Sequence, residues 1–361
     1  MNKKTNKKGF TMVELLAVIL ILGIIAIIAT PILTGIISKS RKSSIQRSAD
    51  FWLKEVRTTI VNERMKGNIM EGKYYINSDG NLCSATKLPC TEPVIIDMTG
   101  NKPSNGTLEI ESGKIKEDGT TFIIGEYQLA YNEKKGSATK ANEIEADERY
   151  KLGTPYIIDP GDGIGRLFYV LEDGDNTKLN KSDGSYHTEL DKVGTAGKGE
   201  VAFILSENIT SEIITWCGSQ GRRTCNAKGA REYLKNHTTD KGWKVEVNLP
   251  TYHQLYNAAV SDKSLNFKYH ESYSGYYPLN DWLRGKLYTV ENTTLPKGYW
   301  TSTASSKETY NSTTGSDRAW VLNQDDGFSF TKKGILSTTY ISHQSGRKGI
   351  RPVITLKKSD M

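Results

Sequence analysis

The sequence predicts an α+β protein in which a long N-terminal helix packs on a small antiparallel sheet and a loop-rich α+β region follows. Three observations support this class. An apolar run over 10–37 contains a single charged residue, Glu14, and is longer than the roughly 20 residues that cross a bilayer as a helix. Apolar residues then recur at helical spacing over 45–60. In much of the rest of the 361-residue chain, short runs of alternating apolar and polar residues are separated by glycine turns.

The apolar run is interpreted as a membrane-spanning helix. A secretory signal peptide has a shorter apolar core, about 7–15 residues, and a small-residue cleavage site after it. This run is longer, and no such site follows it. A plain signal anchor is the other alternative, and it accounts for the lysines before Gly9 through the positive-inside rule. It does not account for Glu14, because a carboxylate inside hydrocarbon costs about 2.5–3.5 kcal/mol.

The stretch KKGFTMVELL resembles the leader of type IV prepilins and pseudopilins. The resemblance implies that a prepilin peptidase removes residues 1–9 by cutting between Gly9 and Phe10, and that Phe10 is then N-methylated. Glu14 falls at the family's acidic position, where the filament pairs it with the Phe10 amine of a neighbouring subunit. Pairing offsets part of the desolvation cost, so Glu14 is expected to set the register of assembly. Pro31 falls where the family often has a helix-kinking proline, and we expect it to bend or locally melt the helix.

Removal of the leader also changes the charge balance. The full chain has 48 basic and 41 acidic residues, and four of the basic residues are leader lysines. The mature chain therefore has 44 basic and 41 acidic residues, a net charge of about +3 that says little about partners. A local basic cluster remains at Lys39, Arg41, Lys42 and Arg47. Contact with lipid phosphates or solvation of the helix surface is the favoured interpretation, and contact with DNA is the alternative.

The helix is predicted to continue past the membrane run as far as about residue 66. Counted from Phe10, the whole helix is then roughly 85 Å long at ~1.5 Å per residue. Gly67 marks its expected end. Its second half has one apolar face, formed by Ile45, Ala49, Trp52, Val56 and Ile60. Such a face needs a partner to cover it.

The following segment supplies that partner. KYYINSDGNLC predicts a strand that runs into an Asp-Gly turn, and alternation at Leu108 and Ile110 predicts another strand. Two more strands are expected over 122–124 and 127–131. The prediction for 38–131 is an amphipathic half-helix with a pilin-like antiparallel meander. The polar stretch 132–148 is predicted to be a linker.

The four cysteines form two close pairs, Cys83 with Cys90 and Cys217 with Cys225. Everything after the membrane run is expected to face the oxidising side, where disulfides are the natural interpretation. A zinc site is the rival interpretation. The cysteines of each pair are separated by six or seven residues rather than two, and the pairs lie in different predicted modules. Reduced thiols are the third alternative.

A second domain is predicted over 149–361, long enough for a core of its own. Strands are expected at PYIID, RLFYVLED and VAFILSENI, and helices near GAREYLKNH, TYHQLYNAAV and NDWLRGKLY. The end of the chain is β-rich and aromatic, in GYWTSTAS, RAWVLN, GFSF and GIRPVITL. Many Ser, Thr, Gly and Asn residues there indicate a loop-heavy α+β architecture.

The order NLPTYHQLYNA, GYWTSTA, RAWVLN and GIRPVITL resembles the C-terminal domains of certain bacterial surface proteins. These share a C-type-lectin-like fold with formylglycine-generating enzymes and collagen-like adhesins. The resemblance implies that Trp300, Trp320, Arg351 and Pro352 are framework or core residues, and ligand stacking is the alternative for the two tryptophans. The enzyme relatives use redox-active or copper-binding cysteines late in the domain. This chain has no cysteine after Cys225, so that chemistry does not carry over.

Signals of catalysis are weak. The histidines, His187, His237, His253, His270 and His343, show no metal-ligand spacing. GDGIG over 161–165 precedes a predicted strand, whereas a phosphate loop opens a helix, so it is interpreted as a turn. The acidic segments EDGDN and NQDDG are also interpreted as turns, with Ca²⁺ binding through oxygen ligands as the alternative. No cofactor is expected.

These features predict a type IV pilin-like subunit, minor or at the tip of a pilus or pseudopilus, because a large head packs poorly around a thin helical core. Its expected partners are a prepilin peptidase, other pilin subunits in a helical filament, the membrane, and a surface ligand such as a glycan or protein. Nucleic acid is not an expected partner. The expected location is the cell membrane, with one span and the C-terminal domain outside, and then the surface filament. The alternatives are a pilin-anchored envelope enzyme and a pseudopilin of a secretion or DNA-uptake system.

Overall fold

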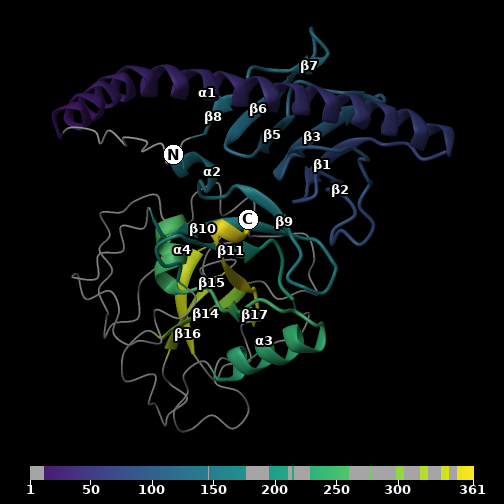
Figure 1. Cartoon of the computed structure of the whole chain (residues 1–361). Coiled ribbons are helices and arrows are strands. Elements are labelled where there is room, and N and C mark those ends of the chain that lie inside the picture. Colours follow the sequence, from purple (N-terminus) through teal and green to yellow (C-terminus); the bar gives the residue numbers. More distant parts are fainter. Residues whose placement is uncertain are drawn as a thin grey trace, which may run out of the picture.

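The computed structural model describes residues 12–144, 146–175, 195–209, 214, 228–259, 277–278, 298–304, 318–323, 335–340 and 348–361. A long helix, α1 (Met12–Met65), is followed by antiparallel sheets (Figure 1). This arrangement confirms the predicted α+β class.

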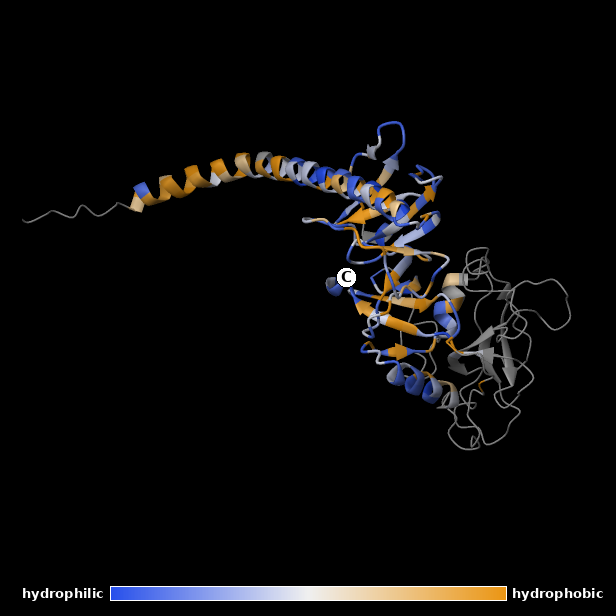
Figure 2. Cartoon of the chain, turned by 90° about the vertical axis from the view of Figure 1, so that its right-hand side faces the viewer, coloured by the Kyte–Doolittle hydropathy of each residue, from blue (hydrophilic) through white to orange (hydrophobic). Residues whose placement is uncertain are grey.

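The helix α1 has two halves with different surroundings. Its N-terminal half projects away from the body of the molecule and is apolar all round (Figure 2). It is the one helix of the described residues that is long and apolar enough to cross a membrane, and its most apolar 18-residue window has no buried residue. The C-terminal half lies on a sheet. Its buried residues are Ile45, Ala49, Trp52, Leu53, Val56 and Ile60, which include the whole predicted face.

Helical structure in α1 continues through Pro31. The expected local melting is therefore absent, and the axis curves gently instead (Figure 2). Proline removes one backbone hydrogen bond from a helix. Two nearby threonines donate hydrogen bonds to backbone carbonyls in this part of the helix: Thr30 Oγ1 donates to the Ala26 carbonyl at 2.6 Å, and Thr34 Oγ1 donates to the Pro31 carbonyl at 3.0 Å.

The first sheet covers the apolar face of α1. In the described residues its strand order is β2-β1-β3-β5-β6-β7, with β4 beside β3 and β8 beside β6, and all of its pairings are antiparallel. Its strands are β1 (Gly72–Ile76), β2 (Leu82–Ser84), β3 (Asn105–Glu111), β4 (Lys114–Ile115), β5 (Thr121–Ile124), β6 (Tyr127–Asn132), β7 (Ser137–Ala138) and β8 (Asn142–Glu143). We call this sheet and the half of α1 that it covers the N-terminal lobe.

The predicted linker over 132–148 is largely part of this sheet, since β7 and β8 both pair with β6. Its polarity is misleading because side chains of α1 satisfy its backbone. Asp50 Oδ1 accepts a hydrogen bond from the Ala138 N–H at 2.8 Å, and Gln46 Nε2 donates to the Ala138 carbonyl at 3.1 Å. Arg57 Nη1 donates to the Gly136 carbonyl at 2.8 Å. The sheet therefore extends about 12 residues beyond the expected boundary at Tyr131.

The described residues from 146 onward form the C-terminal lobe. Its second sheet has the order β12-β18-β11-β10-β9, and all of its pairings are antiparallel. Its strands are β9 (Pro155–Ile158), β10 (Arg166–Asp173), β11 (Glu200–Leu205), β12 (Val247–Asn248) and β18 (Val353–Lys357). Residues of β10 and β11 are buried on both faces of this sheet. Because both faces are buried, apolar residues follow one another almost without interruption along these two strands.

Helices and a third sheet complete the C-terminal lobe. The helices are α2 (Ala146–Arg149), α3 (Lys228–Asp240) and α4 (Tyr252–Ala259), and a 3-10 turn covers Lys358–Asp360. The third sheet has the order β13-β16-β15-β14-β17, and its β14–β17 pair is parallel. Its strands are β13 (Tyr277–Pro278), β14 (Gly298–Ala304), β15 (Arg318–Asn323), β16 (Ile335–Tyr340) and β17 (Lys348–Gly349). The helix expected at NDWLRGKLY and the strand at GFSF lie outside the described residues.

The two lobes share a hydrophobic core. Tyr75, Cys83 and Cys90 of the N-terminal lobe pack in one buried cluster with residues of β9, β10 and α4. Backbone hydrogen bonds also cross the junction. The Cys90 N–H donates to the Gly165 carbonyl at 2.7 Å, and the Gly165 N–H donates to the Cys90 carbonyl at 3.2 Å. The two lobes on either side of the expected boundary near residue 149 therefore pack directly against each other.

Candidate membrane and assembly segment

Glu14 is the only charged side chain of the apolar half of α1. It lies in the first turn of the helix and is exposed. A negative charge in the first turn is favourable because the N-terminal end of a helix carries partial positive charge. The processing residues Gly9 and Phe10 lie outside the described residues. We call the apolar half of α1, residues 12–37, the shaft. It carries a single carboxylate near its start.

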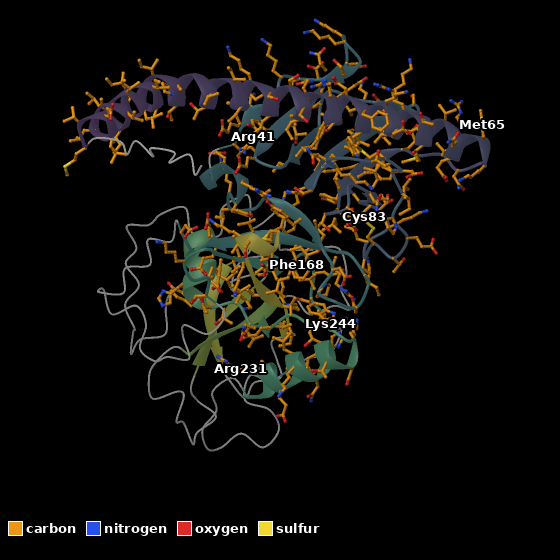
Figure 3. The ribbon with its side chains drawn as sticks, in the orientation of Figure 1. Arg41, Met65, Cys83, Phe168, Arg231 and Lys244 are labelled. Atoms are coloured by element: carbon orange, nitrogen blue, oxygen red, sulfur yellow. A yellow bond between two sulfur atoms is a disulfide. The ribbon has the colours of Figure 1, made fainter. Side chains whose placement is uncertain are left out.

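A basic belt follows the apolar half. We use this name for Lys39, Arg41, Lys42 and Arg47, all of which are exposed. Figure 3 labels Arg41 between the projecting half of α1 and the half that lies on the sheet. Arg47 Nε donates a hydrogen bond to the Ser43 carbonyl at 3.3 Å, one turn nearer the N-terminus. The belt marks the point where α1 passes from its apolar half to the N-terminal lobe.

The C-terminal half of α1 is fixed firmly to the first sheet. Trp52 is completely buried, and its Nε1–H donates to the Gly80 carbonyl at 2.9 Å. Its ring packs against Phe122 with the ring centroids 5.0 Å apart. Together with the hydrogen bonds of Asp50 and Arg57, these contacts hold the C-terminal half of α1 against the first sheet.

The Cys83–Cys90 disulfide is present, with the two Cα atoms 5.6 Å apart. Figure 3 shows Cys83 in the part of the N-terminal lobe that faces the C-terminal lobe. Cys217 and Cys225 lie outside the described residues. Across the described ranges, no group of three or more His, Cys, Asp or Glu side chains is arranged to hold a metal ion.

The acidic segment EDGDN holds a lysine in this structure. Lys358 Nζ lies 2.6 Å from Asp173 Oδ1 and 2.8 Å from Asp175 Oδ2. Burial lowers the pKa of Lys358, but its hydrogen bonds to Asp173 and Asp175 outweigh that effect and raise the pKa overall. The hydrogen bond from Lys358 also lowers the pKa of Asp175. An ammonium thus neutralises the carboxylates that the alternative interpretation assigned to Ca²⁺. Of NQDDG, all but Asn323 lies outside the described residues.

The segment GDGIG forms a turn before β10, as predicted. Asp162 forms a two-pronged ion pair with Arg166, with both N–O distances 2.7 Å. Burial raises the pKa of Asp162, but the hydrogen bonds that its carboxylate accepts from Arg166 and from the Ile164 N–H, together with the charge of Arg166, lower the pKa overall. The Arg166 guanidinium also lies 5.0 Å from the centre of the Trp243 ring. These contacts satisfy the charges of the turn within the lobe.

The predicted framework residues are placed as follows. Arg351 is 2% exposed, and its Nε donates to Asn208 Oδ1 at 3.4 Å. Pro352 is buried, and its carbonyl accepts a hydrogen bond from the Leu205 N–H at 2.9 Å. Trp300 lies in β14 and Trp320 in β15.

Two of the histidines lie in helices. His253 is buried in α4. His237 lies in the last turn of α3, where burial lowers its pKa. His187, His270 and His343 lie outside the described residues. The structure therefore does not assemble these residues into a catalytic group within the part of the chain that it describes.

Glu172, the first residue of EDGDN, is buried and has a role that the sequence did not predict. Its Oε2 accepts hydrogen bonds from Gln254 Nε2 at 2.8 Å and from the Ala196 N–H at 3.0 Å. Gln254 also exchanges hydrogen bonds with Thr251 at the start of α4, as a capping box does. The sequence signal was the T-x-x-Q spacing in TYHQ. This network fixes α4 against the second sheet and gives Glu172 a structural role.

Comparison with known proteins places the strongest signal at the N-terminus. Residues 4–30 match the prokaryotic N-terminal methylation motif. The chain is also 29% identical over 124 residues to the type IV major fimbrial protein FimA of Dichelobacter nodosus, covering 34% of this chain and 72% of that relative. These matches support a prepilin-like protein. No solved structure matches the chain.

The prepilin-like motif has consequences for processing and location. It implies cleavage by a prepilin peptidase and assembly with other pilin subunits. Together with the apolar half of α1, it suggests a membrane-anchored pilus subunit. Proteins of this type are structural subunits rather than enzymes.

Proposed function

We propose that the protein is a minor or tip subunit of a type IV pilus or pseudopilus that presents its C-terminal lobe outside the cell. The observation that carries this proposal is α1 itself. Its exposed apolar half carries one carboxylate and overlaps the methylation motif, and its other half is fixed to a folded lobe. Such a helix is suited first to the bilayer and then to a filament core.

The size of the C-terminal lobe supports a minor or tip position. More than half of the chain lies beyond the first sheet. The Dichelobacter nodosus relative is a major fimbrial protein, and the match to it spans only 34% of this chain. Subunits whose helices share a thin core must place their lobes side by side, so a bulky second lobe is best accommodated at low density or at the end of the filament.

The C-terminal lobe is the proposed binding head, with a C-type-lectin-like fold. Its sequence is rich in Trp, Tyr, Asn and Asp. Aromatic faces stack on apolar patches of polar ligands, while amides and carboxylates fix their orientation. We therefore assign it a surface ligand, a glycan or a protein. Which system the subunit serves, adhesion, secretion or DNA uptake, is tested by assaying these three activities in a strain that lacks the gene.

The first experiment concerns processing. Mass spectrometry of the native N-terminal peptide should identify Phe10 as the first residue, with one added methyl group. A chain that still begins at Met1 in cells with an active prepilin peptidase would contradict the proposal. A second Cys217–Cys225 disulfide, proposed from the sequence, can be mapped in the same digest.

The second experiment concerns assembly. Glu14→Ala should still be cleaved and inserted, but its abundance in sheared filaments should fall about tenfold or more, because removal of one partner strands the other in a low-dielectric core. Glu92→Ala is the matched control, since Glu92 is also an exposed carboxylate but lines a pocket with Glu63 at the opposite, C-terminal end of α1. Equal incorporation of the Glu14→Ala variant and the wild type would count against a role in assembly.

The third experiment concerns the head. The mature chain in detergent is screened against glycan arrays and cell-surface extracts. Saturable binding to a glycan or protein supports the proposed head. Chemical conversion of a substrate without stable binding would favour the alternative of a pilin-anchored envelope enzyme.

A further inference from the structure

The basic belt contains every charged residue between Glu14 and Asp50. All four of its side chains are exposed, and the charges are of one sign. We propose that the basic belt binds phosphates of anionic lipid headgroups at the outer surface of the membrane before the subunit enters a filament. This inference rests on the proposed function, because it assumes that α1 is inserted with the lobes outside.

The spacing along α1 fits a bilayer. Glu14 and Lys39 are 25 residues apart, which corresponds to about 37 Å at ~1.5 Å per residue. A bilayer has a hydrocarbon core of about 30 Å and a thickness of about 40–45 Å with its headgroups. When Glu14 lies at the inner headgroup level, Lys39 therefore reaches the outer one. In this position of the helix both charged ends avoid hydrocarbon, so the desolvation cost that the sequence predicts for Glu14 arises when the subunit enters the filament core rather than in the bilayer.

The belt surrounds the helix rather than forming one face. At about 100° per residue, Lys39, Arg41, Lys42 and Arg47 lie near 0°, 200°, 300° and 80° around the axis. A DNA duplex or the flat surface of a protein would contact only part of such a ring. Lipid headgroups surround a membrane helix on all sides. The angular distribution therefore favours lipid over a one-sided partner.

The direction of the side chains also suits this role. Cα–Cβ bonds in a helix tilt toward its N-terminus, which in α1 is the membrane side. The Arg47 side chain follows this direction, since its Nε donates to the carbonyl of Ser43. Long basic side chains near helix ends extend their charged groups to the interface while their stems cover apolar surface. Side chains just beyond the hydrocarbon can therefore reach back to the phosphates.

The test is lipid selectivity of the full mature chain, purified in neutral detergent. Native mass spectrometry measures adducts with phosphatidylglycerol, which is anionic, and phosphatidylcholine, which is not. Each basic side chain near an anionic surface strengthens binding several-fold. Wild type should retain phosphatidylglycerol about tenfold or more over phosphatidylcholine, and the variant K39Q/R41Q/K42Q/R47Q should lose this preference. A high-salt arm should weaken it as well.

A matched variant controls for net charge. K87Q/K134Q/K135Q/K140Q removes four exposed lysines of the N-terminal lobe that lie outside the belt, so it should keep the preference of the wild type. Equal retention of the two lipids by wild type, or equal loss in both variants, would overturn the proposal. A labelled DNA duplex is titrated in parallel. If wild type binds DNA, the belt variant does not, and wild type shows no lipid preference, the ligand of the basic belt is nucleic acid and the lipid proposal is overturned.

Failure of this inference is distinguishable from failure of the proposed function. The N-terminal mass and the amount in sheared filaments are measured for both variants. A correctly processed wild type that assembles but shows no lipid preference overturns only the lipid proposal. A wild type that is neither processed nor found in filaments overturns the proposed function. An intact Cys83–Cys90 disulfide and a native circular dichroism spectrum show that each variant is folded.

Discussion

Single side chains determine how the helix α1 is attached to the rest of the molecule. Trp52 is the clearest case, since it combines complete burial, a ring contact with Phe122 and a hydrogen bond to the Gly80 carbonyl. Its neighbour Phe51 faces outward and is 43% exposed. These two adjacent aromatic residues are therefore expected to contribute very differently to stability, because only Trp52 points at the sheet.

Trp52→Phe is expected to lower the free energy of unfolding by about 1–3 kcal/mol, because the buried Gly80 carbonyl loses its donor. Phe51→Leu is the control and should change it by no more than about 0.5 kcal/mol, as surface substitutions do. Denaturant unfolding of the mature chain in detergent measures both. Similar losses in the two variants would show that the hydrogen bond and burial of Trp52 do not determine stability here.

At the scale of elements, the end of the chain is fastened to the second sheet by charge. Lys358, just after β18, holds Asp173 at the end of β10 and Asp175 beyond it. The Gly199 N–H, just before β11, donates to Asp175 Oδ1 at 2.9 Å. The same lysine lies 4.9 Å from the centre of the Tyr150 ring. One ammonium group therefore joins the C-terminal turn to the segment 173–175 and to Tyr150.

This arrangement predicts a pH dependence with a defined sign. The pKa of Asp175 is below its ordinary value of 3.8 in the fold, so its contribution is present above about pH 4 and is lost as the pH falls through the lowered pKa. The pKa of Lys358 is above its ordinary value of 10.5, so its contribution is complete below about pH 10 and is lost as the pH rises through the raised pKa. The urea midpoint of Lys358→Gln should be below that of wild type at pH 7 and should approach it at pH 2.5. Lys358→Arg should behave like wild type, and a pH-independent gap would contradict the ion pair.

At the scale of the whole molecule, the disulfide loop connects the two lobes. Cys83 and Cys90 close a short loop in the N-terminal lobe, and Cys90 pairs through its backbone with Gly165 of the C-terminal lobe. A Cβ on Gly165 would lie 2.7 Å from Ile157 Cγ2, so the junction has no spare room. The position of the C-terminal lobe relative to the N-terminal lobe therefore depends on a loop that a disulfide constrains.

The variant C83S/C90S is expected to lower the free energy of unfolding by about 2.5 kcal/mol, the loop-entropy contribution of a disulfide that closes a loop this short. Hydrogen exchange should also accelerate at the amides of residues 90 and 165, since the cross-lobe pair loses its support. The amide of Ile110, within the first sheet, serves as the internal reference. Unchanged exchange at Gly165 would mean that the lobes hold each other without the disulfide.

The sequence by itself determined the local features. The apolar shaft with Glu14, the helical face around Trp52 and the longer strands β1, β3, β5 and β6 could be predicted, because helical and strand periodicities are properties of neighbouring residues. The pairing of Cys83 with Cys90 was accessible for the same reason, since the two residues are separated by a short loop. The position of the basic belt after the shaft is equally a matter of spacing along one helix.

Only the tertiary structure decided the contacts between distant segments. The polar segment 132–148 joins the first sheet because Gln46, Asp50 and Arg57 satisfy its backbone, and no local pattern contains those partners. Lys358 pairs with Asp175, from which it is separated by 183 positions in the chain. The carboxylate that the sequence offered as a possible cation ligand is therefore part of an ion pair. Local sequence specifies which groups are charged or apolar, whereas the burial of one segment by another depends on the whole fold.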